Sequence, residues 1–246
     1  MYNQLHVTAI IPALNEQEAI GQVVSALIAQ QSNDGRPIID QVIVADNGSI
    51  DLTATQANAA GANVVFEPKR GYGAACLAAI NSMVETDVVL FVDGDCSVQA
   101  SQIILLLEPL ADGADLAIGS RCLGYIQPGS MSLPQLIGNG LIARIISLLW
   151  QVQVTDIGPF RAIRYSALQK LAMQDRAYGW TVEMQVKALQ RGLTVREIPV
   201  DCLVRVGCSK VSGTVRGVVG AAFGMFGMIV RLWWQGRQAE KTTLPI

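Results

Sequence analysis

Short apolar runs alternate with helical patterns along the first half of the chain. Five of these runs have the length and the near-continuous apolar character of strands buried on both faces of a sheet. They are Val7 to Ile11, Gln41 to Ala45, Asn63 to Phe66, Val88 to Val92 and Leu116 to Ile118. Because strands that alternate with helices build layered α/β folds, we expect an open, mostly parallel sheet flanked by helices.

The segments between these strands carry helix signals. Apolar residues recur at helical spacing from Ile20 to Ile28, and Asn15 with Glu18 three residues later resembles a capping pair. This pattern predicts a first helix that begins directly after Leu14. Further helices are expected after Ser49, Tyr72 and Ser101.

The second half of the chain departs from this alternation. It contains an apolar stretch from Leu136 to Trp150, a predicted loop from Asp156 to Arg161, a helical pattern from Thr181 to Arg191 and a strand pattern from Val195 to Val200. Glu183 lies on the predicted helix from Thr181 to Arg191, where its side chain faces either a functional site or solvent. We expect one main domain over residues 1–212, followed by an apolar helix and tail over residues 213–246.

Composition narrows the class of protein. The chain has 246 residues, of which 51% are hydrophobic, enough for one sizeable core. Eighteen basic and 20 acidic residues give a net charge of -2, so no overall positive field attracts nucleic acid. The five cysteines are scattered, which fits a reducing, cytoplasmic setting. Only 15% of residues are charged and the mean hydropathy is +0.36, which indicates that part of the surface contacts lipid.

The C-terminal region holds the strongest candidate for that contact. Gly217 to Val230 is an apolar run of about 14 residues, shorter than the roughly 17 to 25 that span a bilayer. Trp233 and Trp234 follow Arg231, an arrangement typical of helices that rest at the membrane surface. The sequence therefore favours peripheral contact, at the inner face of the membrane. The glycines in the run equally suit packing against another helix or a second copy in a homo-oligomer.

Three predicted loops at the carboxyl ends of strands carry candidate chemistry. Asp93-Gly94-Asp95 offers two carboxylates, which suit Mg²⁺ or Mn²⁺ bound to a diphosphate. Asp46-Asn47 offers hydrogen-bonding groups for a nucleobase or ribose, and Lys69-Arg70-Gly71 offers cations at a helix entrance. Taken singly, each has a plain alternative as a solvated turn or a helix cap. Because such loops share one crevice in α/β sheets, their coincidence predicts a nucleotide-diphosphate site.

Together with Pro12-Ala13-Leu14-Asn15-Glu16, these motifs resemble the ordered motifs of family 2 glycosyltransferases with the GT-A fold. The likeness is greatest to the polyprenyl-phosphate branch, which is similar to dolichyl-phosphate mannose synthase. The resemblance implies that Asp93 and Asp95 hold the metal. It also implies a donor-binding set made up of Pro12, Ala13, Asn15, Glu16, Asp46, Asn47, Lys69, Arg70, Gly71, Asp93 and Gly94.

The second half resembles the family less closely. Arg121 stands where the family has an arginine that meets a phosphate, and Arg205 with Lys210 resembles the basic motif that closes over phosphates. The segment from Asp156 to Arg161 resembles one ending in Gly-Phe-Arg, with Pro159 in place of the glycine. For the arginines, surface ion pairing is the alternative. The resemblance thus implies a catalytic set of Asp95, Arg121, Asp156 and Arg205, with Lys210 on the donor.

The first hypothesis is an inverting transferase that moves a hexose from a GDP- or UDP-sugar to polyprenyl phosphate. A phosphate acceptor is already a nucleophile at neutral pH and requires no general base. A second hypothesis keeps the donor but takes a soluble acceptor, a glycerate or a saccharide, with Asp156 as the first candidate base. A nucleotidyltransferase is disfavoured because Pro12 to Glu16 replaces its glycine- and arginine-rich loop. A non-catalytic sugar-nucleotide-binding module is the last alternative.

Overall fold

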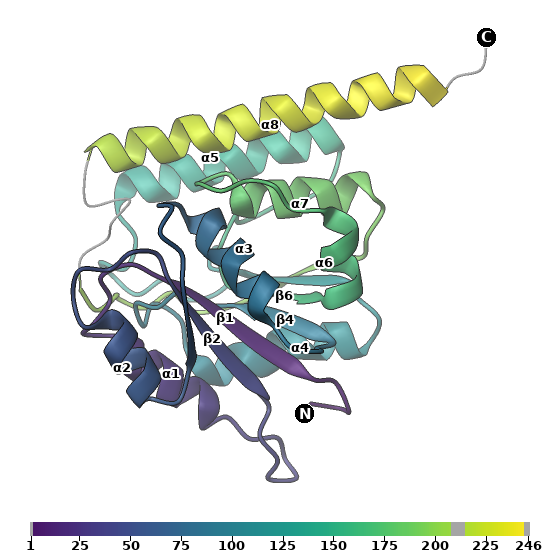
Figure 1. The fold of residues 1–246 in the computed structure, drawn as a ribbon. Helices are drawn as coiled ribbons and strands as arrows, with labels where there is room; N and C mark the ends of the chain where they lie inside the picture. Colours follow the sequence, from purple (N-terminus) through teal and green to yellow (C-terminus); the bar gives the residue numbers. More distant parts are fainter. Residues whose placement is uncertain (1, 208–214, 244–246) are drawn as a thin grey trace.

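The computed structural model describes residues 2–207 and 215–243 and is built on one seven-stranded sheet (Figure 1). The strands are β1 Val7–Ala13, β2 Gln41–Asp46, β3 Asn63–Phe66, β4 Val88–Phe91, β5 Leu116–Ser120, β6 Arg161–Arg164 and β7 Val195–Pro199. Their order across the sheet is β3-β2-β1-β4-β6-β5-β7. Only β6 runs antiparallel to its neighbours, β4 and β5. The prediction of a mostly parallel sheet flanked by helices is confirmed.

Helices cover both faces of this sheet. They are α1 Ile20–Ile28, α2 Thr53–Ala59, α3 Tyr72–Ser82, α4 Ile103–Ala111, α5 Leu133–Trp150, α6 Tyr165–Leu171, α7 Trp180–Gln190 and α8 Val215–Thr243, with a short 3-10 turn at Ala100–Gln102. One apolar cluster joins the sheet to α1, α2 and α4. A second joins the opposite face to α3, α6 and α7. Burial on both faces explains why the strands read as continuous apolar runs.

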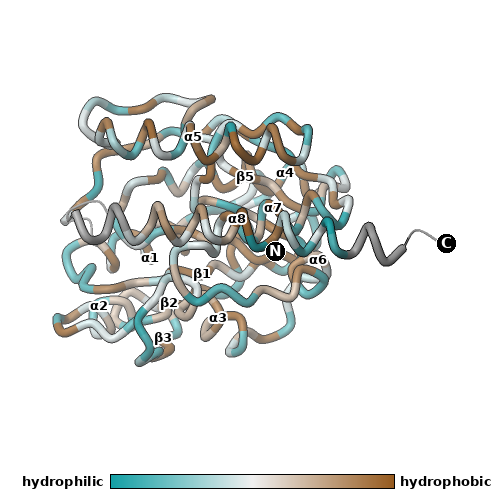
Figure 2. Tube along the Cα trace, turned by 90° about the horizontal axis from the view of Figure 1, so that it is seen from above, coloured by the Kyte–Doolittle hydropathy of each residue, from teal (hydrophilic) through white to brown (hydrophobic). Residues whose placement is uncertain are grey.

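A third layer of helices lies beyond α7. Apolar side chains of α5, α7 and α8 form a separate buried cluster, which includes Ile146, Val186 and Ile229. Figure 1 shows α8 lying along α5 above the rest of the molecule, and Figure 2 shows the hydropathy of both helices from that side. Within residues 2–207 and 215–243, α5 is the one helix whose length and composition would allow it to cross a membrane. Only 17% of its span is buried.

Two local predictions are wrong. The first helix begins at Ile20, and its N-cap residue, Ala19, makes no side-chain cap bond. Asn15 instead adopts a left-handed conformation with φ of 52°, and its Oδ1 accepts a hydrogen bond of 2.9 Å from the backbone N–H of Ile50. Asn15 therefore ties the loop after β1 to the loop after β2. The second error is that strand β6, which starts at Arg161, was not expected, although residues 156–160 do form the predicted loop.

Candidate functional site

A cavity of about 470 Å³ lies at the carboxyl ends of strands β1 to β5, beneath α5 and α8. Most of the residues expected at the site line it. They are Pro12, Ala13, Glu16, Asn47, Arg70, Gly71, Asp93, Gly94, Asp95, Arg121 and Arg205. Four others, Asn15, Asp46, Lys69 and Asp156, are not part of the lining. Lys210 lies outside the described residues.

Asn47 holds two of the predicted loops together. Its Nδ2 donates to the backbone carbonyls of Glu67 and Lys69, at 3.1 and 2.7 Å. Its Oδ1 accepts from the N–H of Gly71 at 2.7 Å. Asp46, one residue earlier, turns to the N–H of Ser49 instead. The loop after β2 therefore reaches the cavity through Asn47, while the predicted contribution of Asp46 has no direct geometric support.

The N-terminus of α3 is covered by another segment of the chain, residues 175–177. The first-turn N–H groups of Gly73 and Ala74 donate to the carbonyls of Ala177 and Arg176, at 3.2 and 3.0 Å. A Cβ atom at Gly71 or Gly73 would overlap the backbone of residues 175 and 176. Because these N–H groups already have acceptors, they are not available to an anion, and the cation Arg70 is the part of the predicted anion site that lines the cavity. The glycines serve the close approach of residues 175–177.

Two cationic residues precede that entrance and differ in placement. Arg70 lies on the cavity wall, and its Nη2 donates to the carbonyl of Gly48 at 2.9 Å. Lys69 is exposed and its backbone N–H bonds to Glu67. Arg70 is thus the cation of this pair that faces the site.

Asp93 and Asp95 emerge from the end of β4 and face the cavity. Burial and the charge of Asp95 raise the pKa of Asp93 to about 7. The Tyr72 hydroxyl donates to Asp93 Oδ1 at 3.3 Å. Asp95 Oδ2 forms an ion pair with Arg205 Nη1 at 3.0 Å, and its Oδ1 accepts the N–H of Ser97 at 3.0 Å. Asp95 therefore has an arginine in direct contact, whereas Arg205 and Arg121 act on Asp93 through their charge.

This pair fits a divalent cation. Mg²⁺ and Mn²⁺ are commonly held by one or two carboxylates together with substrate phosphates and water. Burial and, after it, the charge of Asp95 raise the pKa of Asp93, and a cation bound between the two carboxylates would favour its charged form. Within the described part of the chain, no three His, Cys, Asp or Glu side chains converge, so two carboxylates are what the protein offers. Ser97 contributes its backbone N–H to Asp95.

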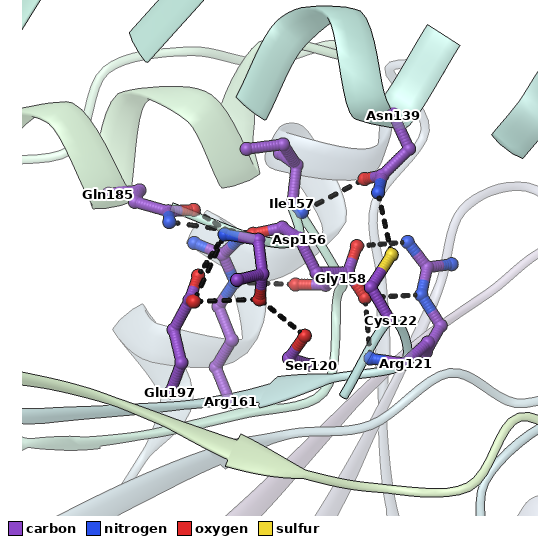
Figure 3. Close-up of polar contacts among 11 residues, drawn as sticks. Ser120, Arg121, Cys122, Asn139, Asp156, Ile157, Gly158, Arg161, Gln185 and Glu197 are labelled. Atoms are coloured by element: carbon purple, nitrogen blue, oxygen red, sulfur yellow. Dashed lines mark hydrogen bonds and ion pairs between the residues drawn. The ribbon is translucent and has the colours of Figure 1, made fainter. Parts of the chain in front are cut away.

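Arg121 follows β5 and is held by Asp156 (Figure 3). Its Nη2 and Nε donate to the two carboxylate oxygens at 2.7 and 2.8 Å, and its backbone N–H adds a third bond at 2.7 Å. Burial alone lowers the pKa of Arg121, but the hydrogen bonds and charge of Asp156 raise it overall. Asp156 is fully buried. Because it pairs with Arg121 through both oxygens and does not line the cavity, its placement argues against the predicted role as a base.

Arg161 is also buried, and it makes no surface ion pair. Its guanidinium donates to the carbonyls of Gly158 and Thr181, both at 2.7 Å, and to Gln185 Oε1 at 3.2 Å. Burial lowers its pKa to about 10. Figure 3 shows this group beneath the turn that carries Asp156. Arg161 therefore supports the turn that holds Arg121 and does not itself line the cavity.

Sequence reasoning missed the residues that complete the cavity. Tyr72, Tyr178 and Thr181 line one side, and small or apolar residues of α5 and α8 close it from above. The latter are Pro134, Gly138, Ile142, Ala221, Ala222 and Met225. The apolar character of both helices is evident from the sequence. That they meet over Asp93 and Asp95 is evident only from the fold.

The family model for glycosyl transferase family 2 matches residues 8–172. The chain belongs to this family. An uncharacterized glycosyltransferase of Mycobacterium tuberculosis is 35% identical over 216 residues, which cover 87% of this chain and 93% of the relative. The undecaprenyl-phosphate mannosyltransferase of Micrococcus luteus is 30% identical over 96% of this chain and 99% of its own length.

Solved structures confirm the fold. Glucosyl-3-phosphoglycerate synthase of Mycobacterium tuberculosis, solved with Mn²⁺, uridine diphosphate and phosphoglyceric acid, superposes with a TM-score of 0.75. The match covers 94% of this chain and 79% of that chain, at 20% identity. The chain therefore has the GT-A fold that the resemblance implied, and it is a glycosyltransferase.

Proposed function

We propose that this protein transfers a hexose, with inversion, from a GDP- or UDP-sugar to polyprenyl phosphate. One observation carries the proposal: a single cavity joins the acidic pair Asp93 and Asp95 to an apolar wall made by α5 and α8. The acidic pair suits the diphosphate of the donor. The apolar wall suits an acceptor whose phosphate is attached to hydrocarbon.

The donor side is formed by the loops after β1, β2, β3 and β4. Asn47 and Arg70 lie where they can meet the nucleoside and its phosphates. Asp93 and Asp95 would hold Mg²⁺ or Mn²⁺, which neutralises charge on the departing nucleoside diphosphate. Arg205 lies beside the same pair and adds a second positive charge there. Lys210 remains a predicted donor contact.

The acceptor side favours a lipid phosphate over a soluble one. Among the described residues of the lining, the cations are Arg70, Arg121 and Arg205, and each already has a protein acceptor. Arg121 can orient one phosphate, because its bond to Asp156 fixes the plane of its guanidinium. A phosphoglycerate would present a carboxylate as well, and the apolar wall offers no cation for it. The second pKa of the acceptor's phosphate is near 6, so this phosphate is already deprotonated at neutral pH. No protein base is therefore needed.

The relatives support the same acceptor. The Micrococcus luteus protein named for undecaprenyl phosphate matches nearly the whole chain at 30% identity. A dolichyl-phosphate hexose transferase of Haloferax volcanii is 29% identical over 82% of this chain. The phosphoglycerate enzyme is only 20% identical.

A direct comparison of acceptors tests this function. The protein is incubated with Mn²⁺ and radiolabelled UDP- or GDP-hexoses, and each mixture receives undecaprenyl phosphate in detergent or 3-phosphoglycerate. We expect label to enter the lipid fraction with at least one donor and to stay out of the glycerate. Transfer to glycerate alone would assign the soluble acceptor to this site and contradict the proposal.

We further propose that the protein sits at the cytoplasmic face of a membrane, with α5 and α8 against the lipid. Large apolar side chains are exposed on both helices. They are Leu133, Ile137, Leu141 and Leu148 on α5 and Phe223, Phe226, Val230 and Trp234 on α8. Apolar side chains of this kind bury themselves in the interface between headgroups and acyl chains. A lipid acceptor would then reach the cavity from the side that these helices cover.

Vesicle flotation tests the membrane contact. Ile137 and Leu141 are 62% and 58% exposed, and replacing both with serine should release about tenfold more protein from vesicles that contain anionic lipid. Ile50 and Leu52, which are 89% and 57% exposed between β2 and α2 and do not line the cavity, provide a control pair of the same residue types. Equal loss of binding in both double variants would show that α5 has no special role.

A further inference from the structure

The segment that joins α6 to α7, residues 172–179, lies between α8 and the entrance of α3. Its one aromatic residue, Tyr178, lines the cavity. The segment itself contains no charged side chain that lines the cavity. Its contacts on three sides nevertheless connect the outer helix layer to the acidic pair.

On the first side the segment is fixed to the entrance of α3. The carbonyls of Arg176 and Ala177 accept the N–H groups of Ala74 and Gly73. The two backbones approach so closely that neither Gly71 nor Gly73 has room for a Cβ atom. Since α3 begins at Tyr72, whose hydroxyl donates to Asp93, a shift of the segment also shifts this hydrogen bond.

On the second side the segment is held by Glu183, which is 2% exposed. Its carboxylate accepts the backbone N–H groups of Gln174 and Asp175, at 3.1 and 2.8 Å. Lys187 Nζ pairs with the same carboxylate at 2.6 Å. Glu183 therefore faces neither solvent nor the cavity, and its buried charge anchors the segment to the start of α7.

On the third side the segment meets the glycine face of α8. A Cβ atom at Gly224 would lie 3.4 Å from Tyr178 Cβ, and one at Gly220 would lie 3.7 Å from Tyr178 Cε2. A Cβ atom at Gly179 would lie 3.1 Å from Met228 Cβ. Gly220 and Gly224, two of the glycines that seemed suited to another helix or a second copy of the chain, thus accommodate Tyr178 of the same chain.

We propose that residues 174–179, which we call the strut, transmit the position of α8 to the donor site. A displacement of α8 would then displace the groups that bind the donor. Tyr178 is the positioning residue at one end, and Tyr72, bonded to Asp93, is at the other. The inference rests on the proposed function, and it adds that contacts of α8 influence binding of the nucleoside diphosphate. The exposed face of α8, which carries Phe223 and Phe226, is then the place where a membrane would act on this geometry.

Two leucine variants on the same helix test the strut. Gly224→Leu places its side chain against Tyr178, whereas Gly227→Leu has nothing within 4 Å of its Cβ position. Both changes add the same apolar surface and helix propensity. Calorimetry with UDP and with GDP in Mn²⁺, without acceptor or lipid, should show about tenfold weaker binding for Gly224→Leu only, since displacements of about 1 Å in a positioned site can cost up to about a hundredfold.

Steady-state kinetics separate positioning from general damage. For Gly224→Leu the KM for the donor should rise while the KM for the acceptor and the thermal midpoint stay near the wild-type values. Should this leucine lower the thermal midpoint, Glu183→Gln is the second variant, because it loosens the segment from the opposite side and lies outside the cavity. The same selective rise in donor KM is expected for it.

The outcomes distinguish this inference from the proposed function. If the wild type binds a nucleoside diphosphate and both leucine variants bind it equally well, the proposed role of residues 174–179 is rejected. The proposed transferase function is not affected by that result. A normal donor KM in stable Glu183→Gln would reject the strut in the same way. If the wild type binds neither nucleotide, the proposed function fails and the inference fails with it.

Discussion

Replacing Asp95 with asparagine should lower the rate of hexose transfer by about two to three orders of magnitude, the usual loss when one charge-stabilising group is removed. Asp95 faces the cavity beside Asp93 and pairs with Arg205 at 3.0 Å. Asparagine keeps the size of the side chain and an oxygen for the N–H of Ser97. It removes the negative charge that a divalent cation and Arg205 require.

Asp112→Asn is the matched control, because Asp112 is exposed at the end of α4 and does not line the cavity. Transfer is measured at saturating Mn²⁺, and circular dichroism reports the fold. The control should keep full activity, and both variants should keep the wild-type spectrum. Wild-type transfer by Asp95→Asn would reject the assignment of the acidic pair to the metal and the diphosphate.

The second large effect is expected at Arg121, and it concerns stability as well as transfer. Arg121→Met leaves the fully buried carboxylate of Asp156 without its cation. Breaking a buried ion pair in this way lowers the free energy of unfolding by about 3–5 kcal/mol. Transfer should fall by about a hundredfold or more, because the phosphate of the acceptor loses its orienting group.

A double variant separates the two effects. Arg121→Met with Asp156→Leu removes the stranded charge, so part of the lost stability should return in urea unfolding while transfer stays low. Arg36→Met is the control for a surface pair, since Arg36 and Asp34 are 71% and 57% exposed, and it should leave the free energy of unfolding close to the wild-type value. Recovery of transfer in the double variant would show that Arg121 serves the fold alone.

The strands and the shared crevice could be predicted because their signals are local. Continuous apolar runs mark strands that are buried on both faces, and the carboxyl ends of parallel strands meet at one edge. Strand β6 was missed because it begins and ends with arginine. Arg161 is buried with its hydrogen bonds satisfied by two carbonyls and Gln185, and two of these partners, Thr181 and Gln185, are distant in sequence.

The site was predicted at the level of loops, and errors arose in the assignment of single residues. Asp46 and Lys69 lie next to Asn47 and Arg70, which line the cavity in their place. Gly71 and Gly73 at the start of α3 fit a phosphate loop by pattern, yet residues 175–177 take the space beside them, and their N–H groups donate to Asn47 Oδ1 and to the carbonyl of Ala177. Both errors come from contacts across the fold, which the spacing of residues along the chain does not encode.

The most direct test of the central claim is the thermal unfolding midpoint of the wild-type protein with UDP or GDP, each with and without Mn²⁺. A ligand that binds only the folded state stabilises it, by about 2.7 kcal/mol at a hundred times its Kd. We predict that at least one of these nucleotides raises the midpoint and that the rise requires the metal. An unchanged midpoint with both nucleotides, in Mn²⁺ and in Mg²⁺, would contradict a donor site at Asp93 and Asp95.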